Sequence, residues 1–384
     1  LYESIEDAID RGATELWLVS YEKDTAGNLT NTLRKTLEIE AGVTLTLHMN
    51  GVKLEGTVGS PALTVSGGTL TVQGEADLVS QNIIASSENP APAIEVTGGT
   101  VTFKGAVDAT GSASDDAVAS AIEVSGGTVT FEGAVNATAQ KIDTAQPSGY
   151  TLAPAINVTG GEVTFAQKLT ATGGIFKDGT NLSKQEPAVY ATSGTLDFQG
   201  DLDLNGGLKL TSSAVLKNKL TQGTFSVSAG TGSSPLSVKD SSVYKKVSDL
   251  LAEGYACVKT DSLAEGKEKE YANTRAYTCS DNVTIVKHEH EWKLDSQYPY
   301  LHSCACGKSE NHEYDNSTGK CKICQSECSH KDVDNDGTCF TCGEKMTVEI
   351  EASDGTKTYG TDFKAAMKAA ENGTTVKLLA DVSI

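Results

Sequence analysis

The chain has 384 residues, 38 of them glycine, and carries a formal net charge of −20. This acidic balance argues against nucleic-acid binding, because phosphate groups would be repelled. No apolar run approaches the ~18 residues of a membrane span, so no membrane insertion is expected. The length suits two or three domains or one elongated repeat domain, and because the chain begins without methionine we expect a segment of a larger protein.

Residues 1–60 are predicted to begin with an amphipathic helix and to continue as strands. Ile5, Ala8 and Ile9 share one face of a helix within residues 3–11. Residues 16–19 are predicted as a strand, and apolar residues alternate with polar ones along residues 36–56. We expect the helix to cap the first coils of a repeat domain and to shield their open edge.

Residues 61–240 contain one short sequence five times. The copy at Ala93 reads AIEVTGGTVTFKG, and related copies begin at Ala62, Ala121, Ala155 and Ala188. Alternation of apolar and polar residues is typical of strands with one buried face, and the glycine pair favours a tight corner. Three short strands in ~30 residues predict one coil of a parallel β-helix, with about 6–8 coils stacked at ~4.8 Å.

Equivalent residues of successive coils are expected to stack into ladders inside the domain. The aromatic ladder would contain Phe103, Phe131, Phe165 and Phe198, with Val72 as a smaller member. An aliphatic ladder would contain Ile94, Ile122, Ile156 and Val189. Both ladders are predicted to form the core.

The repeats offer few groups for catalysis. Residues 61–240 contain no arginine, histidine or tryptophan. Alternation places Asp197, Asp201 and Asp203 outward, where they could hold calcium or flank a glycosidic bond. A solvated strand face is the favoured interpretation, so we expect no enzyme. The alternative is a polysaccharide lyase, a glycoside hydrolase or a glycan-binding module on the β-helix face.

Residues 241–287 are predicted to close the repeat domain with a helix over residues 241–254 and a hairpin. Cys257 and Cys279 lie on the two expected strands, and neither has a histidine or a second cysteine nearby in the sequence. We therefore predict a cross-strand disulfide between them, which would stabilise the cap by roughly 3 kcal/mol.

Residues 288–346 have a different composition, rich in cysteine and histidine. Cys-x-x-Cys turns direct two thiolates to one tetrahedral ion, and too little apolar sequence is present for a core. We predict two structural zinc ions. Disulfides are the alternative; they would explain the cysteines but not the interleaved histidines.

The ligands divide into two sets in this prediction. One site is assigned to Cys328, His330, Cys339 and Cys342; the other would draw on His302, Cys304, Cys306, His312, Cys321 and Cys324, while His288 and His290 are also of ligand type. Residues 332–337 resemble the start of a calcium loop, but Gly343 stands where the pattern needs glutamate. A polar turn is therefore predicted there rather than a calcium site.

Residues 347–384 repeat the pattern of the first segment. Phe363, Ala366, Met367 and Ala370 form a helical apolar face, Gly373 ends the helix, and a strand begins near Val376. We expect the start of a further β-helix whose helix face and strand edge would pack against another molecule. The alternative is a small αβ tail packed on its own chain.

The repeats, the closing stretch 251–256, residues 283–292 and the Cys/His-rich stretch resemble right-handed parallel β-helix, pectin-lyase-like, surface proteins of Gram-positive gut bacteria. Units similar to the Cys328 quartet recur in those proteins. The resemblance implies an extracellular location, at the bacterial cell surface or wall, and no particular reaction. We expect a structural or adhesive rod that spaces domains or presents ligands, with neighbouring repeat domains of the same or another chain, and host or bacterial glycans or proteins, as candidate partners.

Overall fold

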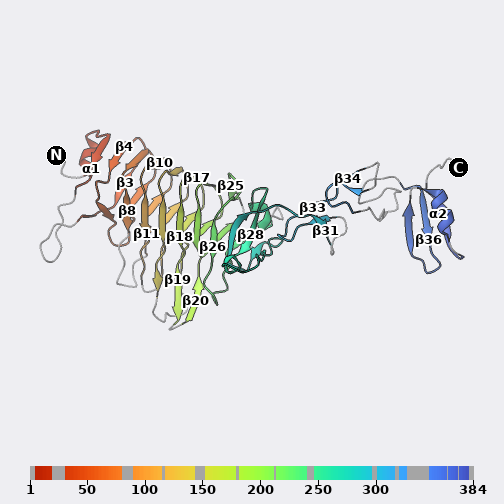
Figure 1. Cartoon of the computed structure of the whole chain (residues 1–384). Helices are drawn as coiled ribbons and strands as arrows, with labels where there is room; N and C mark the ends of the chain where they lie inside the picture. The colour runs from red at the N-terminus through yellow and green to blue at the C-terminus, as the bar shows by residue number, and fades with distance from the viewer. Residues whose placement is uncertain are drawn as a thin grey trace. The chain divides into compact units, whose positions relative to one another are not determined.

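The computed structural model of the chain describes residues 5–19, 31–79, 90–114, 117–142, 152–178, 181–211, 213–239, 246–295, 301–315, 320–326, 346–360, 362–370 and 372–379. The chain divides into two compact units, Leu1–Glu289 (unit 1) and His290–Ile384 (unit 2). Both units are mainly β (Figure 1). None of the described helices is long and apolar enough to cross a membrane.

Unit 1 is built from three long sheets, numbered here by their first strands. Sheet 1 contains β1 (Glu15–Trp17), β4 (Thr44–His48), β7 (Thr69–Gln73), β10 (Thr100–Phe103), β13 (Thr128–Phe131), β17 (Glu162–Phe165), β22 (Thr195–Phe198) and β25 (Val215–Leu216). Sheet 2 contains β2 (Thr32–Arg34), β5 (Lys53–Glu55), β8 (Ala76–Val79), β11 (Val107–Thr110), β14 (Val135–Thr138), β18 (Leu169–Thr172), β23 (Leu202–Asn205), β26 (Thr224–Ser226), β30 (Val283–Lys287) and β28 (Tyr255–Lys259). Sheet 3 contains β3 (Leu37–Ile39), β6 (Leu63–Val65), β9 (Ile94–Val96), β12 (Ile122–Val124), β16 (Ile156–Val158), β21 (Val189–Ala191), β24 (Leu208–Thr211), β27 (Leu236–Lys239) and β29 (Thr278–Cys279).

Smaller elements complete the two units. Unit 1 also has helix α1 (Ile5–Asp10), two 3-10 helices, η1 (Val247–Leu250) and η2 (Thr260–Leu263), and a side sheet of β15 (Lys141–Ile142), β19 (Ile175–Asp178) and β20 (Asn181–Gln185). Unit 2 contains β31 (Lys293–Leu294), β32 (Leu301–Ser303) and β33 (Ser309–Asn311) in one sheet and β34 (Tyr314–Asp315) with β35 (Lys320–Cys321) in another. Its last sheet has β36 (Val348–Glu351) between β37 (Lys357–Gly360) and β38 (Thr375–Leu378), with helix α2 (Phe363–Ala369) between β37 and β38 in the chain.

The chain of unit 1 passes through sheets 3, 1 and 2 in that order, repeatedly. It follows β6, β7 and β8, then β9, β10 and β11, then β12, β13 and β14. Each strand pairs in parallel with its equivalent in the next repeat, for example Val101 opposite Val129. Antiparallel pairing begins where β28, β29 and β30 join the sheets. These long parallel sheets are compatible with the predicted β-helix (Figure 1).

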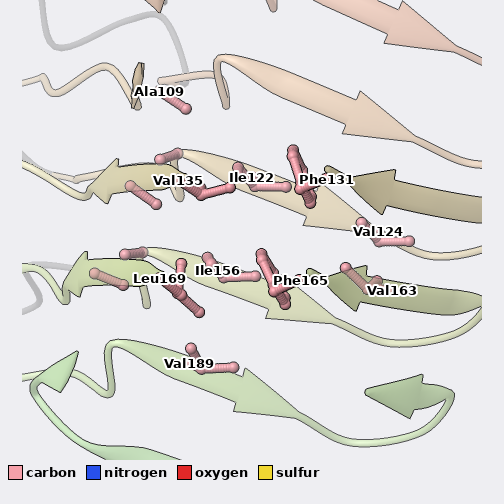
Figure 2. Packing of buried hydrophobic residues seen from close by; sticks show 14 of the residues in the cluster. Ala109, Ile122, Val124, Phe131, Val135, Ile156, Val163, Phe165, Leu169 and Val189 are labelled. Atoms are coloured by element: carbon pink, nitrogen blue, oxygen red, sulfur yellow. The ribbon is translucent and has the colours of Figure 1, made fainter. Parts of the chain in front are cut away.

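The predicted ladders are confirmed. Phe131 stacks between Phe103 and Phe165, with ring centroids 5.0 Å and 5.1 Å apart. Phe198 continues the stack at 5.5 Å, and Val72 lies opposite Phe103 in the register. Figure 2 shows Phe131 above Phe165 in adjacent repeats.

The aliphatic ladder is confirmed in the same way. Ile94, Ile122, Ile156 and Val189 occupy consecutive register positions of sheet 3, and all four are fully buried. Figure 2 shows Ile122, Ile156 and Val189 at equivalent places in three successive repeats. Identical phase in every copy is what allows one residue type to fill one core position along the unit.

Glycine is required at the corner between sheet 3 and sheet 1. Gly127 has a φ of +75°, and a Cβ there would lie 2.6 Å from the carbonyl oxygen of Gly99 in the preceding repeat. An L side chain would be strained by the positive φ and would also meet backbone. The glycine pair of four copies, and Gly194 alone in the copy at Ala188, therefore serve both the turn and the close approach of repeats.

The two ends of unit 1 differ from the prediction to different degrees. Helix α1 forms, with Ala8 fully buried and Ile5 and Ile9 packed against the core. The helix predicted over residues 241–254 is wrong for its described part, where only the 3-10 helix η1 forms. The chain becomes extended there because Leu251 forms a β-bridge with Leu220.

One outward ladder of sheet 3 brings two carboxylates into register, and it gives a pH-dependent prediction. Glu123 lies between Glu95 and Asn157 on adjacent strands. Burial raises the pKa of Glu123 and the Glu95 carboxylate raises it further, while the Ser120 hydroxyl and the Asn157 amide partly offset both effects. The folded state therefore favours the protonated acid, and stability is lost as the pH rises above the pKa of an unfolded glutamate.

We expect Glu123→Gln to increase the free energy of unfolding near pH 7 and to have no such effect near pH 3, where both states are protonated. Urea denaturation at the two pH values measures this. Glu75→Gln, at an exposed position, is the matched control and should change little at either pH. Equal stability of wild type and Glu123→Gln at pH 7 would contradict the argument.

Candidate metal centre

Four side chains of unit 2 gather into one group with the composition of a zinc site. His302 lies on β32, His312 follows β33, Cys321 ends β35, and Cys324 follows three residues later. One ligand atom from each lies within 4.8 Å of those from the other three. The turn after β35 is tight, since Gln325 donates its backbone N–H to the Cys321 carbonyl and has a φ of +59°.

The distances within this group match tetrahedral coordination. Nδ1 of His302 lies 3.8 Å from Sγ of Cys321, and Nδ1 of His312 lies 3.5 Å from Sγ of Cys324. In a tetrahedral zinc site, Zn–S bonds of ~2.3 Å and Zn–N bonds of ~2.0–2.1 Å place neighbouring ligand atoms about 3.3–3.8 Å apart. The four ligands therefore fit one ion. Nε2 of His302 lies 3.7 Å from a Glu310 carboxylate oxygen.

The electrostatic environment favours a thiolate in this group. Burial opposes ionisation of Cys321, but the backbone N–H groups of Cys324 and Ile323 and the side chains of His312 and Cys324 outweigh it and lower the pKa of the thiol to about 6. A thiolate is the form that binds a metal ion. This group is therefore prepared to bind a cation at neutral pH.

A second group combines His288 and His290 with Cys304 and Cys306. Nδ1 of His290 lies 3.3 Å from Sγ of Cys306, again a tetrahedral spacing. The hydroxyl of Tyr271 lies 2.8 Å from Nδ1 of His288. Burial raises the pKa of the Cys306 thiol to about 11, and the Cys304 side chain adds to this effect. A metal ion that binds Cys306 would have to displace the proton of its thiol.

The six ligands predicted to share one site are thus divided. His302, His312, Cys321 and Cys324 form one group, whereas Cys304 and Cys306 join His288 and His290. The prediction left these two histidines unassigned. Their spacing could have assigned them, since His288-x-His290 and Cys304-x-Cys306 each place two side chains on one side of an extended chain.

The remaining predicted quartet, Cys328, His330, Cys339 and Cys342, lies outside the described residues, as does the turn at residues 332–337. The predicted total of two ions is therefore already reached by the two groups found among the described residues. If the quartet also binds metal, the chain holds three.

The predicted disulfide between Cys257 and Cys279 is not formed. Both residues are buried thiols. Cys257 belongs to β28, which pairs with β30 in sheet 2, whereas Cys279 belongs to β29, which pairs with β27 in sheet 3. The prediction failed because it paired the two strands with each other. Burial raises the pKa of the Cys279 thiol.

The prediction that the three carboxylates lie on a solvated strand face is wrong for Asp197. Asp201 and Asp203 are exposed, but Asp197 retains only 2% of its accessible surface. Its carboxylate accepts hydrogen bonds of 2.8 Å from the side-chain amides of Gln199 and Asn218. Asn218 comes from the segment after β25, and this covering could not be read from strand alternation. Asp203 lies 3.9 Å from Lys168, the residue before β18.

Comparison of the chain with protein-family models, with curated proteins and with solved structures finds no match. The sheets and the two Cys/His groups are therefore the features from which a function can be inferred.

Proposed function

We propose that unit 1 is a right-handed parallel β-helix that acts as a non-catalytic structural rod. The passage of the chain through sheets 3, 1 and 2 in constant order supports a coil of three strands. The constant register supports stacking of each coil on the last. Helix α1, packed against the core, would cap the first coil.

One observation carries the structural role: outward polar side chains bond to their counterparts on neighbouring coils. Lys104 pairs with Glu132, and Asn136 donates a 2.7 Å hydrogen bond to Asp108. Lys217, just after β25, reaches past β22 to pair with Glu162 of β17 at 2.7 Å. Such pairs tie coil to coil along the axis, as a spacer requires, and leave the carboxylates engaged rather than converging on a substrate.

The second part of the proposal is that zinc holds the Cys/His segment together. Among the described residues from 290 to 326, those that are buried are Asp295, His302, Cys304, Cys306, His312 and Cys321. Five of these six are candidate ligands, and no buried aliphatic side chain accompanies them, so the metal would replace a hydrophobic core. The mixed thiolate and imidazole donors suit zinc. Both groups offer four protein ligands, which is typical of structural rather than catalytic sites.

We place the rod outside the cell, at a bacterial cell surface or wall, on the strength of the resemblance stated above. Its partners would be neighbouring repeat domains of the same or another chain, with glycans or proteins as ligands of an adhesive face. A carbohydrate-active enzyme remains the alternative to be tested.

The test is incubation of the chain with a panel of acidic and neutral polysaccharides, followed by assay for reducing ends and for unsaturated products. We expect neither product. A glycan array with the same chain separates an adhesive role from a purely structural one. Turnover that is lost in Asp203→Asn and kept in Glu75→Gln would replace the structural proposal with a catalytic one.

A further inference from the structure

The same helix–turn–strand element occurs at the start of unit 1 and near the end of unit 2. Ile5, Ala8 and Ile9 of α1 correspond to Phe363, Ala366 and Met367 of α2. Ala8 and Ala366 are both buried. Gly12 and Gly373 follow the two helices with φ values of +80° and +89°. Strands β1 and β38 then begin.

Backbone hydrogen bonds show which strand residues correspond. Leu18 donates its N–H to the His48 carbonyl, and Thr46 donates to the Thr14 carbonyl, so the even-numbered residues of β1 face β4. Leu379 donates to the Thr347 carbonyl, so the odd-numbered residues near β38 face β36. Alternate residues direct their backbone groups to opposite edges of a strand.

Apolar Leu16 of β1 and Leu18, just after β1, therefore correspond to Val376 and Leu378 of β38. The backbone groups of Leu16 and Leu18 point to β4. Those of Val376 and Leu378 point to an edge of β38 that has no partner strand among the described residues. Antiparallel β36 lies on the opposite edge of β38. The edge of β38 that pairs with β36 corresponds to the outer edge of β1, which faces away from β4. No described strand pairs with this outer edge of β1.

Burial agrees with this correspondence. Leu18 is 3% exposed and Ile9 packs against the core, whereas Leu378 and Met367 are 47% and 52% exposed. The residues of unit 2 lack the cover that the first coils give their counterparts in unit 1. Each copy of the element thus has the neighbour that the other copy lacks.

We infer that the outer edge of β1 is a docking edge for an antiparallel β-hairpin of the β36–β37 type, which would precede α1 in the chain as β36 and β37 precede α2. The C-terminal segment is then the opening of a further repeat, with its hairpin already in place. The inference rests on the proposed rod of stacked coils and specifies how one repeat joins the next. An exposed edge strand is a template for such strand addition.

The register predicts what the hairpin would cover. Glu349 of β36 lies opposite Lys377 of β38, and the position of Lys377 corresponds to Trp17. Trp17 is 59% exposed, and its ring stacks on His48 of β4 at 4.2 Å. A docked hairpin would place the Glu349 position on the other side of Trp17, at the 4.5–5.5 Å typical of cross-strand pairs.

The experiment grafts residues 346–358 directly before Leu1 of the full chain. Because Ile5 corresponds to Phe363, this graft continues into α1 in frame. A Trp292→Phe background leaves Trp17 as the one tryptophan of the 2 in the sequence. We expect the graft to reduce acrylamide quenching of Trp17 and to raise the unfolding midpoint of unit 1 by about 2–4 °C.

The control is Glu349→Pro within the graft. The odd-numbered residues of β36 face β38, so proline removes an N–H aimed at the docking edge and spares the bonds to β37. This control should behave like the ungrafted chain. Quenching and midpoint equal in all three proteins, with unit 1 folded in each, would overturn the docking edge while leaving the β-helix intact. Loss of the folded unit in the ungrafted chain would instead count against the β-helix itself.

Discussion

Removal of metal by a chelator is expected to unfold residues 290–326 while unit 1 remains folded. Among the described residues of this segment, almost all of the buried ones are candidate ligands, so little else among them holds it together. Structural zinc in small modules contributes about 10–16 kcal/mol of apparent binding free energy, which is folding free energy in such modules. Purified protein should accordingly contain at least two zinc ions per chain.

Trp292 provides a local signal for this transition. Its ring lies 5.0 Å from His290 and 4.7 Å from His302, between the two Cys/His groups. In a Trp17→Phe background, its emission should shift to longer wavelength on chelation and return when zinc is restored. Chemical denaturation followed by far-ultraviolet circular dichroism would report unit 1 separately.

Cys321→Ala and Cys279→Ala form a matched pair for the same prediction. Both thiols are buried, but Cys279 belongs to neither metal group. Cys321→Ala should lower the zinc content by about one ion per chain, because three ligands hold zinc less well than four. Cys279→Ala should keep the full content. An intact segment that contains no metal would contradict the zinc proposal.

The repeats were predictable because every copy repeats the same residues at the same phase. Phe103, Phe131 and Phe165 lie at equivalent places in AIEVTGGTVTFKG-like sequences, so their stacking follows from the sequence alone. The corner glycines followed for the same reason. Because each repeat contacts the next, a pattern within one repeat predicts contacts between residues far apart in the sequence. A single strand gives no such prediction.

Other features depended on contacts that no local pattern records. Asp197 is covered by Asn218, which lies beyond the last of the recurring sequences. Leu251 leaves its expected helix to bridge Leu220. The ligand types of the metal groups were evident, but their division depended on how the chain folds back, which placed His302 with Cys321 rather than with Cys304.

Phe131→Ala is expected to lower the free energy of unfolding of unit 1 by roughly 3–5 kcal/mol, as is typical when a buried aromatic ring is removed from a core. Phe131 is fully buried and stacks on rings both above and below. The cavity would open in the middle of the ladder, where the parallel strands of neighbouring repeats are held in register on each side and can relax little. Urea denaturation of wild type and variant measures the difference.

Phe198→Ala is the matched control for this ladder. Phe198 is only partly buried, and it contacts one ladder neighbour, Phe165, at a longer centroid distance of 5.5 Å. The same change of side chain should therefore cost less at Phe198 than at Phe131, because less surface is buried and one stacking partner is absent. Equal losses at the two positions, or a loss below about 1 kcal/mol at Phe131, would show that the aromatic ladder does not hold adjacent repeats together.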